Sequence, residues 1–131
     1  MLGLDTTVLV RYLVRDDKAQ FEKARRLIRN ELNGGGRLFV SQLVLLETEW
    51  VLRSCYRLKK AEIVQTFNDL LDAADLQLED EEAVEESLYL WKDATADFAD
   101  CLIGARNRRA GCRATASSDR KAAGLPGFIA V

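Results

Sequence analysis

The chain of 131 residues contains no histidine, which removes a large class of catalytic sites. Imidazole is the usual general base, so Ser-His-Asp and Cys-His arrangements are excluded. The three cysteines, Cys55, Cys101 and Cys112, are odd in number and far apart, and no histidine accompanies them. A zinc site is therefore nearly excluded, and we expect each cysteine to be a small buried side chain. Any catalytic chemistry has to come from carboxylates.

Long apolar runs are also missing. No stretch approaches the roughly 18 apolar residues of a membrane span, and the amino terminus lacks the basic-then-apolar pattern of a secretory signal. We therefore expect a cytoplasmic protein with no membrane contact. The composition, 48% hydrophobic and 31% charged with a formal net charge of −2, predicts a single globular domain over residues 1–131. Because the charge is slightly negative, any contact with nucleic acid must be local.

Short apolar runs alternate with longer segments of helical periodicity, which is the signature of an α/β fold. The pattern predicts strands at residues 1–5, 37–41, 76–78, 112–117 and 128–131. It predicts helices at residues 8–14, 18–32, 42–58, 60–74, 81–92 and 98–110. There is no internal repeat and no low-complexity linker.

Acidic residues stand where these expected strands and helices meet. Asp5 ends the first strand, and Asp119 follows the strand at 112–117. Open α/β sheets bind ligands at the carboxyl ends of parallel strands. Asp100 lies in the first turn of the helix at 98–110, beside its apolar face. Asp97 precedes it by one turn and has two equal interpretations, a helix N-cap or a member of the site.

Two glutamates, Glu47 and Glu49, lie on the expected helix at 42–58 and must face different ways. Leu43 and Trp50 flank Glu47 at helical spacing, which predicts that Glu47 projects from the apolar face. A carboxylate there needs a metal, a base or a polar cavity. A metal site is our interpretation, with a buried ion pair as the alternative. Glu49 has Arg53 four residues later, which predicts an ordinary solvated salt bridge.

Four carboxylates converging at about 4 Å would repel each other by roughly 4 kcal/mol per pair at an effective dielectric near 20. They would therefore need a cation. Oxygen ligands without imidazole or thiolate suit Mg²⁺ or Mn²⁺. Such a site is best suited to hydrolysis of a phosphodiester, because the metal activates water and stabilises the leaving oxygen.

Four segments of the chain resemble, in order and spacing, the PIN-domain toxin ribonucleases of VapBC-type toxin-antitoxin modules. They are residues 4–13, 45–52, 96–103 and 117–121. The resemblance spans essentially the whole chain. It implies a three-layer α/β/α sandwich around a central, mainly parallel sheet of four or five strands. It also implies a Mg²⁺- or Mn²⁺-dependent endoribonuclease, a homodimer, and a cognate VapB-like antitoxin that blocks the site.

The resemblance assigns roles to individual residues. The catalytic quartet would be Asp5, Glu47, Asp100 and Asp119. The metal ligands would be Asp5, Asp97, Asp100 and Asp119, supported by Thr6 and Ser117. We further expect an antitoxin arginine or lysine to enter among Asp5, Asp100 and Asp119.

The chain departs from the family pattern at two positions. Thr7 stands where the family commonly has Asn, so the hydrogen bond that steadies the first aspartate must be made differently or is missing. Ser117 stands where the family often has Thr and lacks the methyl group that fixes the rotamer.

Basic residues are clustered, and those nearest the acids are candidates for RNA contact. Arg120 and Lys121 directly follow Asp119, so we expect them to contact the RNA backbone. Arg108 and Arg109, with Arg106, end a helix, where cations complement the helix dipole.

Three other classes of protein share parts of the pattern. A haloacid-dehalogenase-like phosphatase has a second acid two residues after the first, where this chain has Thr7. A receiver-like module needs an acidic pair after a strand, and Asp16 and Asp17 follow a helix. A PIN-like protein-binding module with a degenerate site remains the alternative, and metal-dependent RNA cleavage would separate it from an enzyme.

Overall fold

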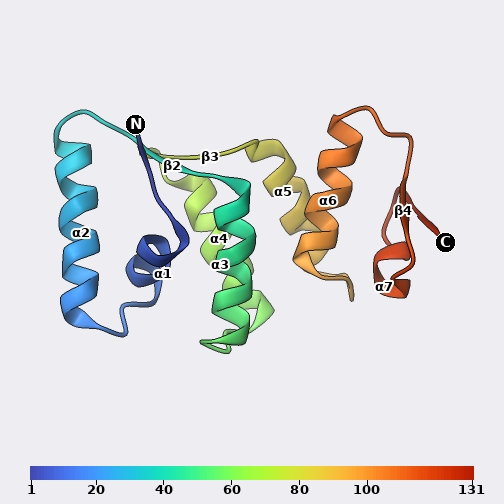
Figure 1. Cartoon of the computed structure of the whole chain (residues 1–131), viewed down its shortest axis with the longest axis horizontal. Coiled ribbons are helices and arrows are strands. Elements are labelled where there is room, and N and C mark those ends of the chain that lie inside the picture. Colours follow the sequence, from blue (N-terminus) through green and yellow to red (C-terminus); the bar gives the residue numbers. More distant parts are fainter. The chain divides into compact units, whose positions relative to one another are not determined.

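The computed structural model describes all 131 residues as two compact units, Met1–Glu79 and Asp80–Val131 (Figure 1). The relative placement of the two units is not determined, so each is described by itself. No helix combines the length and the apolar character needed to cross a membrane.

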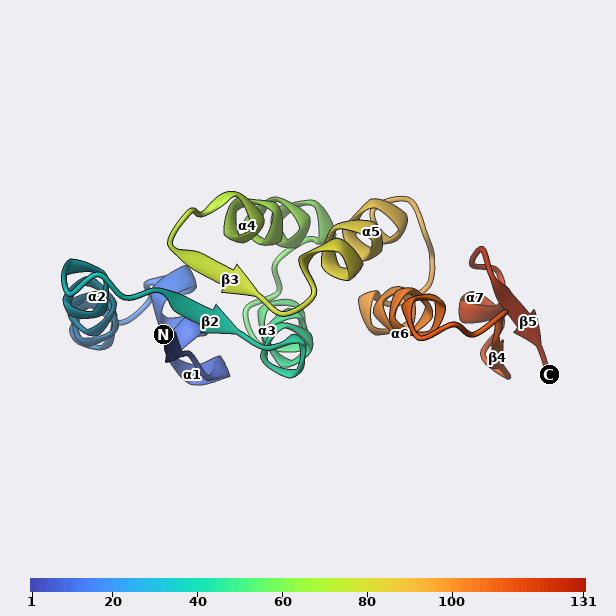
Figure 2. The same cartoon turned by 90° about the horizontal axis from the view of Figure 1, so that it is seen from above.

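The amino-terminal unit is built around a parallel three-stranded sheet. Its elements are β1 (Leu2–Gly3), α1 (Thr6–Val14), α2 (Lys18–Asn33), β2 (Leu38–Val40), α3 (Gln42–Ser54), α4 (Lys60–Asp72) and β3 (Leu76–Leu78). The strand order is β1-β2-β3, and Leu38 pairs with Leu2 on one side and Leu76 on the other. Parallel strands need crossover connections, and helices provide them here. Figure 2 shows α4 on one side of β2 and β3, and α1 and α3 on the other.

The carboxyl-terminal unit contains α5 (Glu81–Trp91), α6 (Phe98–Arg109), β4 (Thr115–Ser117), α7 (Arg120–Ala123) and β5 (Phe128–Ala130). Helices α5 and α6 pack together, and the rings of Trp91 and Phe98 lie 5.2 Å apart between centroids. Strands β4 and β5 form a parallel two-stranded sheet. The connection between these two strands is short, because its helix, α7, has only four residues.

The structure confirms an α/β protein with parallel strand pairing, but it corrects the predicted sheet. We expected one sheet of four or five strands, whereas the five strands form a three-stranded and a two-stranded sheet. The strands are only two or three residues long. Each therefore offers few backbone hydrogen bonds, and apolar patterning alone does not specify which strands pair.

The helix predicted at 42–58 ends earlier, at Ser54. Arg57 has a left-handed conformation with φ of 55°, which stops the helix. The N–H groups of Tyr56 and Leu58 donate back to the carbonyls of Val51 and Leu52 at 3.3 and 3.0 Å. The chain direction after α3 is therefore set by these hydrogen bonds, and Tyr56 is held in the turn.

The burial expected of the cysteines is confirmed only in part. Cys101 is buried in α6, but Cys55 and Cys112 are exposed. Both exposed cysteines follow the end of a helix, where the chain turns at the surface.

Candidate active site

Asp5 occupies the N-cap position of α1, with one residue between it and the end of β1. Its carboxylate oxygen Oδ1 accepts hydrogen bonds from the Val8 N–H at 3.0 Å and from the Thr7 hydroxyl at 2.8 Å. The Val8 hydrogen bond lowers the pKa of Asp5 most, and the Thr7 hydroxyl lowers it further. Asp5 is thus an ionised, oriented carboxylate at the carboxyl end of a parallel strand.

Thr7, which stands where the resemblance predicted an asparagine, makes the hydrogen bond that steadies Asp5. Its hydroxyl donates to the same oxygen, Oδ1, as the backbone of Val8 does. The second departure, Ser117, has a comparable role near Asp119, because its Oγ accepts from the Asp119 N–H at 3.0 Å. A hydroxyl therefore orders the chain beside each of these two aspartates.

Glu47 lies on α3, and its predicted position on the buried face is wrong. The buried positions of α3 are Gln42, Leu45, Thr48, Glu49 and Leu52. Glu47 is exposed, and so are the apolar neighbours that suggested burial, Leu43 at 79% and Trp50 at 54%. The mistake arose because this helix carries large apolar side chains on two faces, and only one of them meets the core.

Glu49 takes the buried position instead. Its carboxylate accepts from Nε of Arg53 at 2.7 Å, so the predicted ion pair is confirmed. The expectation of a solvated pair is wrong for the glutamate, whose side chain is only 5% exposed, while that of Arg53 is 48% exposed. Arg53 is the cation that makes burial of this carboxylate tolerable.

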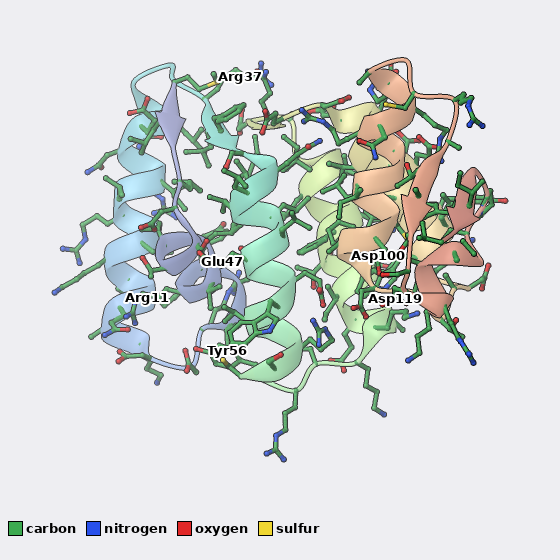
Figure 3. The ribbon with its side chains drawn as sticks, turned by 45° about the vertical axis from the view of Figure 1, so that its right-hand side comes forward. Arg11, Arg37, Glu47, Tyr56, Asp100 and Asp119 are labelled. Atoms are coloured by element: carbon green, nitrogen blue, oxygen red, sulfur yellow. The ribbon has the colours of Figure 1, made fainter.

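The exposed Glu47 belongs to α3, the helix that packs against α1. Helix α1 packs against α3, and Val51, one turn after Glu47, lines a cavity together with Thr6 and Thr7 of α1. Figure 3 labels Glu47 in this region. The amino-terminal unit therefore carries Asp5 at the N-cap of α1 and Glu47 on α3, two helices that pack together.

In the carboxyl-terminal unit, three aspartates stand at the starts of helices. Asp97 is the N-cap residue of α6, but its side chain makes no capping hydrogen bond, and Asp100 follows in the first turn. Asp119 is the N-cap residue of α7, where its Oδ1 accepts from the N–H groups of Lys121 at 2.8 Å and Ala122 at 3.2 Å. Figure 3 shows Asp100 and Asp119 next to each other.

The electrostatics also connect these three aspartates. Partial burial raises the pKa of Asp100 most, and the negative charges of Asp97 and Asp119 raise it further. The ion pairs of this unit, between Arg108 and Glu86 and from Arg109 to two other acids, involve none of the three. The aspartates thus form a negative cluster that a cation would stabilise.

The chemistry of this donor set fits a hard divalent cation, because all the donors are carboxylate oxygens. Within each unit by itself, however, no three His, Cys, Asp or Glu side chains are placed to hold a metal ion. The predicted ligands divide between the units, with Asp5 in the first and Asp97, Asp100 and Asp119 in the second.

The basic residues differ in what they contact. Arg109 donates to Asp80 at 2.8 Å and to Glu82 at 2.9 Å, and Arg108 pairs with Glu86, so both join α6 to α5. Arg120 and Lys121 are exposed on α7 immediately after Asp119. Sequence reasoning missed one feature, the cavity beside Asp5 that Arg11 and Tyr56 help to line.

The model of the PIN domain family matches residues 3–126. This chain belongs to the PIN domain family. It is also similar to a protein named VapC ribonuclease from Aquifex aeolicus (strain VF5), with 24% identity over 118 residues, 90% of this chain and 87% of the relative. The resemblance inferred from four short segments is thereby confirmed. The match spans both compact units, so this PIN domain includes all five candidate acids.

Proposed function

We propose that this PIN domain is a metal-dependent endoribonuclease that hydrolyses RNA phosphodiester bonds and is the toxin component of a toxin-antitoxin module. The observation that carries the proposal is the family match over residues 3–126, which includes acids positioned by helix N-termini in both units. The relative's name, VapC ribonuclease, supports RNA as the substrate.

In this proposal the two units act as one nuclease domain over residues 1–131. Asp5, Glu47, Asp100 and Asp119 are the catalytic residues, and Asp97 joins Asp5, Asp100 and Asp119 as a metal ligand. A bound Mg²⁺ or Mn²⁺ supplies charge neutralisation at the phosphate and an activated water. The chain itself orients Asp5 through Thr7 and Val8, and it positions Asp119 through Ser117 and the first turn of α7.

The partners in this proposal are an RNA substrate, a VapB-like antitoxin and a second copy of the chain, all in the cytoplasm. The name of the relative supports the antitoxin. The second candidate, a protein-binding module with a degenerate site, is disfavoured because no position of the acidic quartet has lost its carboxylate.

Metal removal tests the proposal directly. Protein treated with EDTA should cleave no RNA, and addition of Mg²⁺ or Mn²⁺ should restore cleavage, because the acidic cluster repels phosphate until a cation neutralises it. Sequencing of RNA ends after incubation with total RNA provides the measurement. Cleavage that is equally fast in EDTA would refute the metal dependence. RNA left intact with every cation would favour the degenerate module.

Thr7 should act as a positioning residue for Asp5. Thr7→Val keeps the shape but removes the donor to Oδ1, so we expect the rate of cleavage to fall by roughly 10-fold or more. Thr7→Ser should retain most of the rate. The required Mg²⁺ concentration should rise in Thr7→Val and stay unchanged in Thr7→Ser. Equal behaviour of both variants would mean that the hydroxyl has no role.

A further inference from the structure

A cavity lies beside Asp5 in the amino-terminal unit, between α1 and the end of α3. Its volume is about 180 Å³, and it is lined by Thr6, Thr7, Val10, Arg11, Val51 and Tyr56. Thr7, one of these lining residues, also donates its hydroxyl to the Asp5 carboxylate at 2.8 Å. The cavity therefore adjoins the first acid of the candidate active site.

Tyr56 is fixed in the wall of this cavity. Its N–H donates to the Val51 carbonyl at 3.3 Å, and the next residue, Arg57, has the left-handed conformation that turns the chain. Burial and the negative charge of Asp16 raise the pKa of the Tyr56 hydroxyl, which stays protonated at neutral pH. Tyr56 lines the cavity and is 37% exposed, so its aromatic ring can contact a ligand there.

Arg11 supplies a cation at the same place. It lines the cavity with Tyr56 and also a second hollow of about 330 Å³ between α1 and α2, in which Lys23 and Gln20 take part. The ion pairs of the amino-terminal unit involve Arg25 and Arg53 but not Arg11. The Arg11 guanidinium can thus bind a phosphate of a chain that lies across both hollows.

An aromatic ring, an arginine and a small cavity next to a carboxylate site match the chemistry of one nucleotide of single-stranded RNA. Bases stack on aromatic side chains with little dependence on sequence, and arginine binds the backbone phosphate. We propose that this cavity binds the base of the nucleotide next to the scissile phosphodiester, stacked on Tyr56, while Arg11 contacts the adjoining phosphate. The inference rests on the proposed function, because it assigns Asp5 to the site of RNA cleavage.

Binding of fluorescein-labelled oligouridylate and oligoadenylate to the Asp100→Asn protein in Mg²⁺, measured by anisotropy, tests this subsite. Adding Tyr56→Ala should weaken binding of both oligomers by roughly 5- to 100-fold, and Tyr56→Phe should bind nearly as well as the parent, because it keeps the ring. Adding Arg11→Gln should lower the slope of log affinity against log salt by about 0.7.

Matched controls separate local from general effects. Tyr89 is an exposed tyrosine on α5, and Arg29 is an exposed arginine on α2 away from the cavity lining. Tyr89→Ala and Arg29→Gln should bind as the parent does. Crosslinking with RNA that contains 4-thiouridine provides a second measurement that needs no substitution at Tyr56, and the crosslinks should map to the Val51–Tyr56 segment.

The outcomes distinguish this inference from the proposed function. If wild-type protein cleaves RNA with Mg²⁺ but Tyr56→Ala and Arg11→Gln keep the wild-type KM, the subsite is wrong and the nuclease stands. If both variants lose RNA binding but no metal supports cleavage, the cavity binds RNA as inferred, and the proposed nuclease function fails together with the scissile phosphodiester assigned beside the cavity. The subsite would be overturned if no 4-thiouridine crosslink mapped to the Val51–Tyr56 segment. It would also be overturned if an antitoxin peptide, but not RNA, contacted Tyr56.

Discussion

Asp100→Asn should reduce metal-dependent RNA cleavage by roughly 100-fold or more, without unfolding the protein. Asn keeps the shape of the side chain but removes the charge that the proposed metal site requires, and loss of one preorganised electrostatic contact has effects of this size. Gel assays of RNA cleavage at saturating Mg²⁺ would measure the loss.

Thermal denaturation should separate this effect from damage to the fold. Burial and the charges of Asp97 and Asp119 raise the pKa of Asp100 in the folded protein. A carboxyl group with a raised folded pKa destabilises the protein at neutral pH, where the group is ionised. Asp100→Asn should therefore have an unchanged or higher Tm.

Asp93 provides a control, because it is an exposed aspartate between α5 and α6. Asp93→Asn should cleave RNA at the wild-type rate. Wild-type cleavage by Asp100→Asn would remove Asp100 from the site, and a large fall in its Tm would mean that its role is structural.

Local features of the site were predictable from the sequence. Asp5 and Asp119 lie just after short strands, as the sequence predicted. The helix that follows Asp5 was also predicted, but the one-turn helix α7 that Asp119 caps was not. The strand at Leu76–Leu78 and the helix starts at Gln42 and Phe98 were predicted as well. Capping and periodicity depend on neighbours in the sequence, so one chain is enough to read them.

Features that depend on contacts between distant segments were not predictable. Leu43 and Trp50 suggested a buried stripe on α3, but the face that meets the core is the one that carries Glu49. The cavity lined by Tyr56 depends on where α3 ends and on how α1 packs against it. Its cause is the left-handed turn at Arg57, and no glycine or asparagine marks that position in the sequence.

The pairing of strands was the other failure. Apolar runs identified all five strands, but each is two or three residues long, so side-chain alternation could not specify neighbours. The error leaves the local positions of the four aspartates unchanged, because each lies just after a strand or at the start of a helix.

Glu47→Gln and Glu49→Gln should have opposite consequences, although the two residues are only two positions apart on α3. Glu47 is exposed, so Glu47→Gln should change the free energy of unfolding by no more than about 0.5 kcal/mol. It should nevertheless lower the cleavage rate by roughly 100-fold, because the proposed site loses a charge that the fold does not use.

Glu49→Gln should instead destabilise the protein by about 1–3 kcal/mol, because it breaks a buried charged hydrogen bond to Arg53. The loss of stability should be smaller than for a fully buried pair, since about half of the Arg53 side chain reaches solvent.

Urea unfolding and cleavage assays well below Tm would measure the stability and the cleavage rate of each variant. A glutamate whose substitution lowers the rate and leaves stability unchanged acts on the substrate or the metal. One whose substitution lowers stability alone acts on the fold. If Glu47→Gln lowered stability while Glu49→Gln lowered only the rate, α3 would present the opposite face to the site.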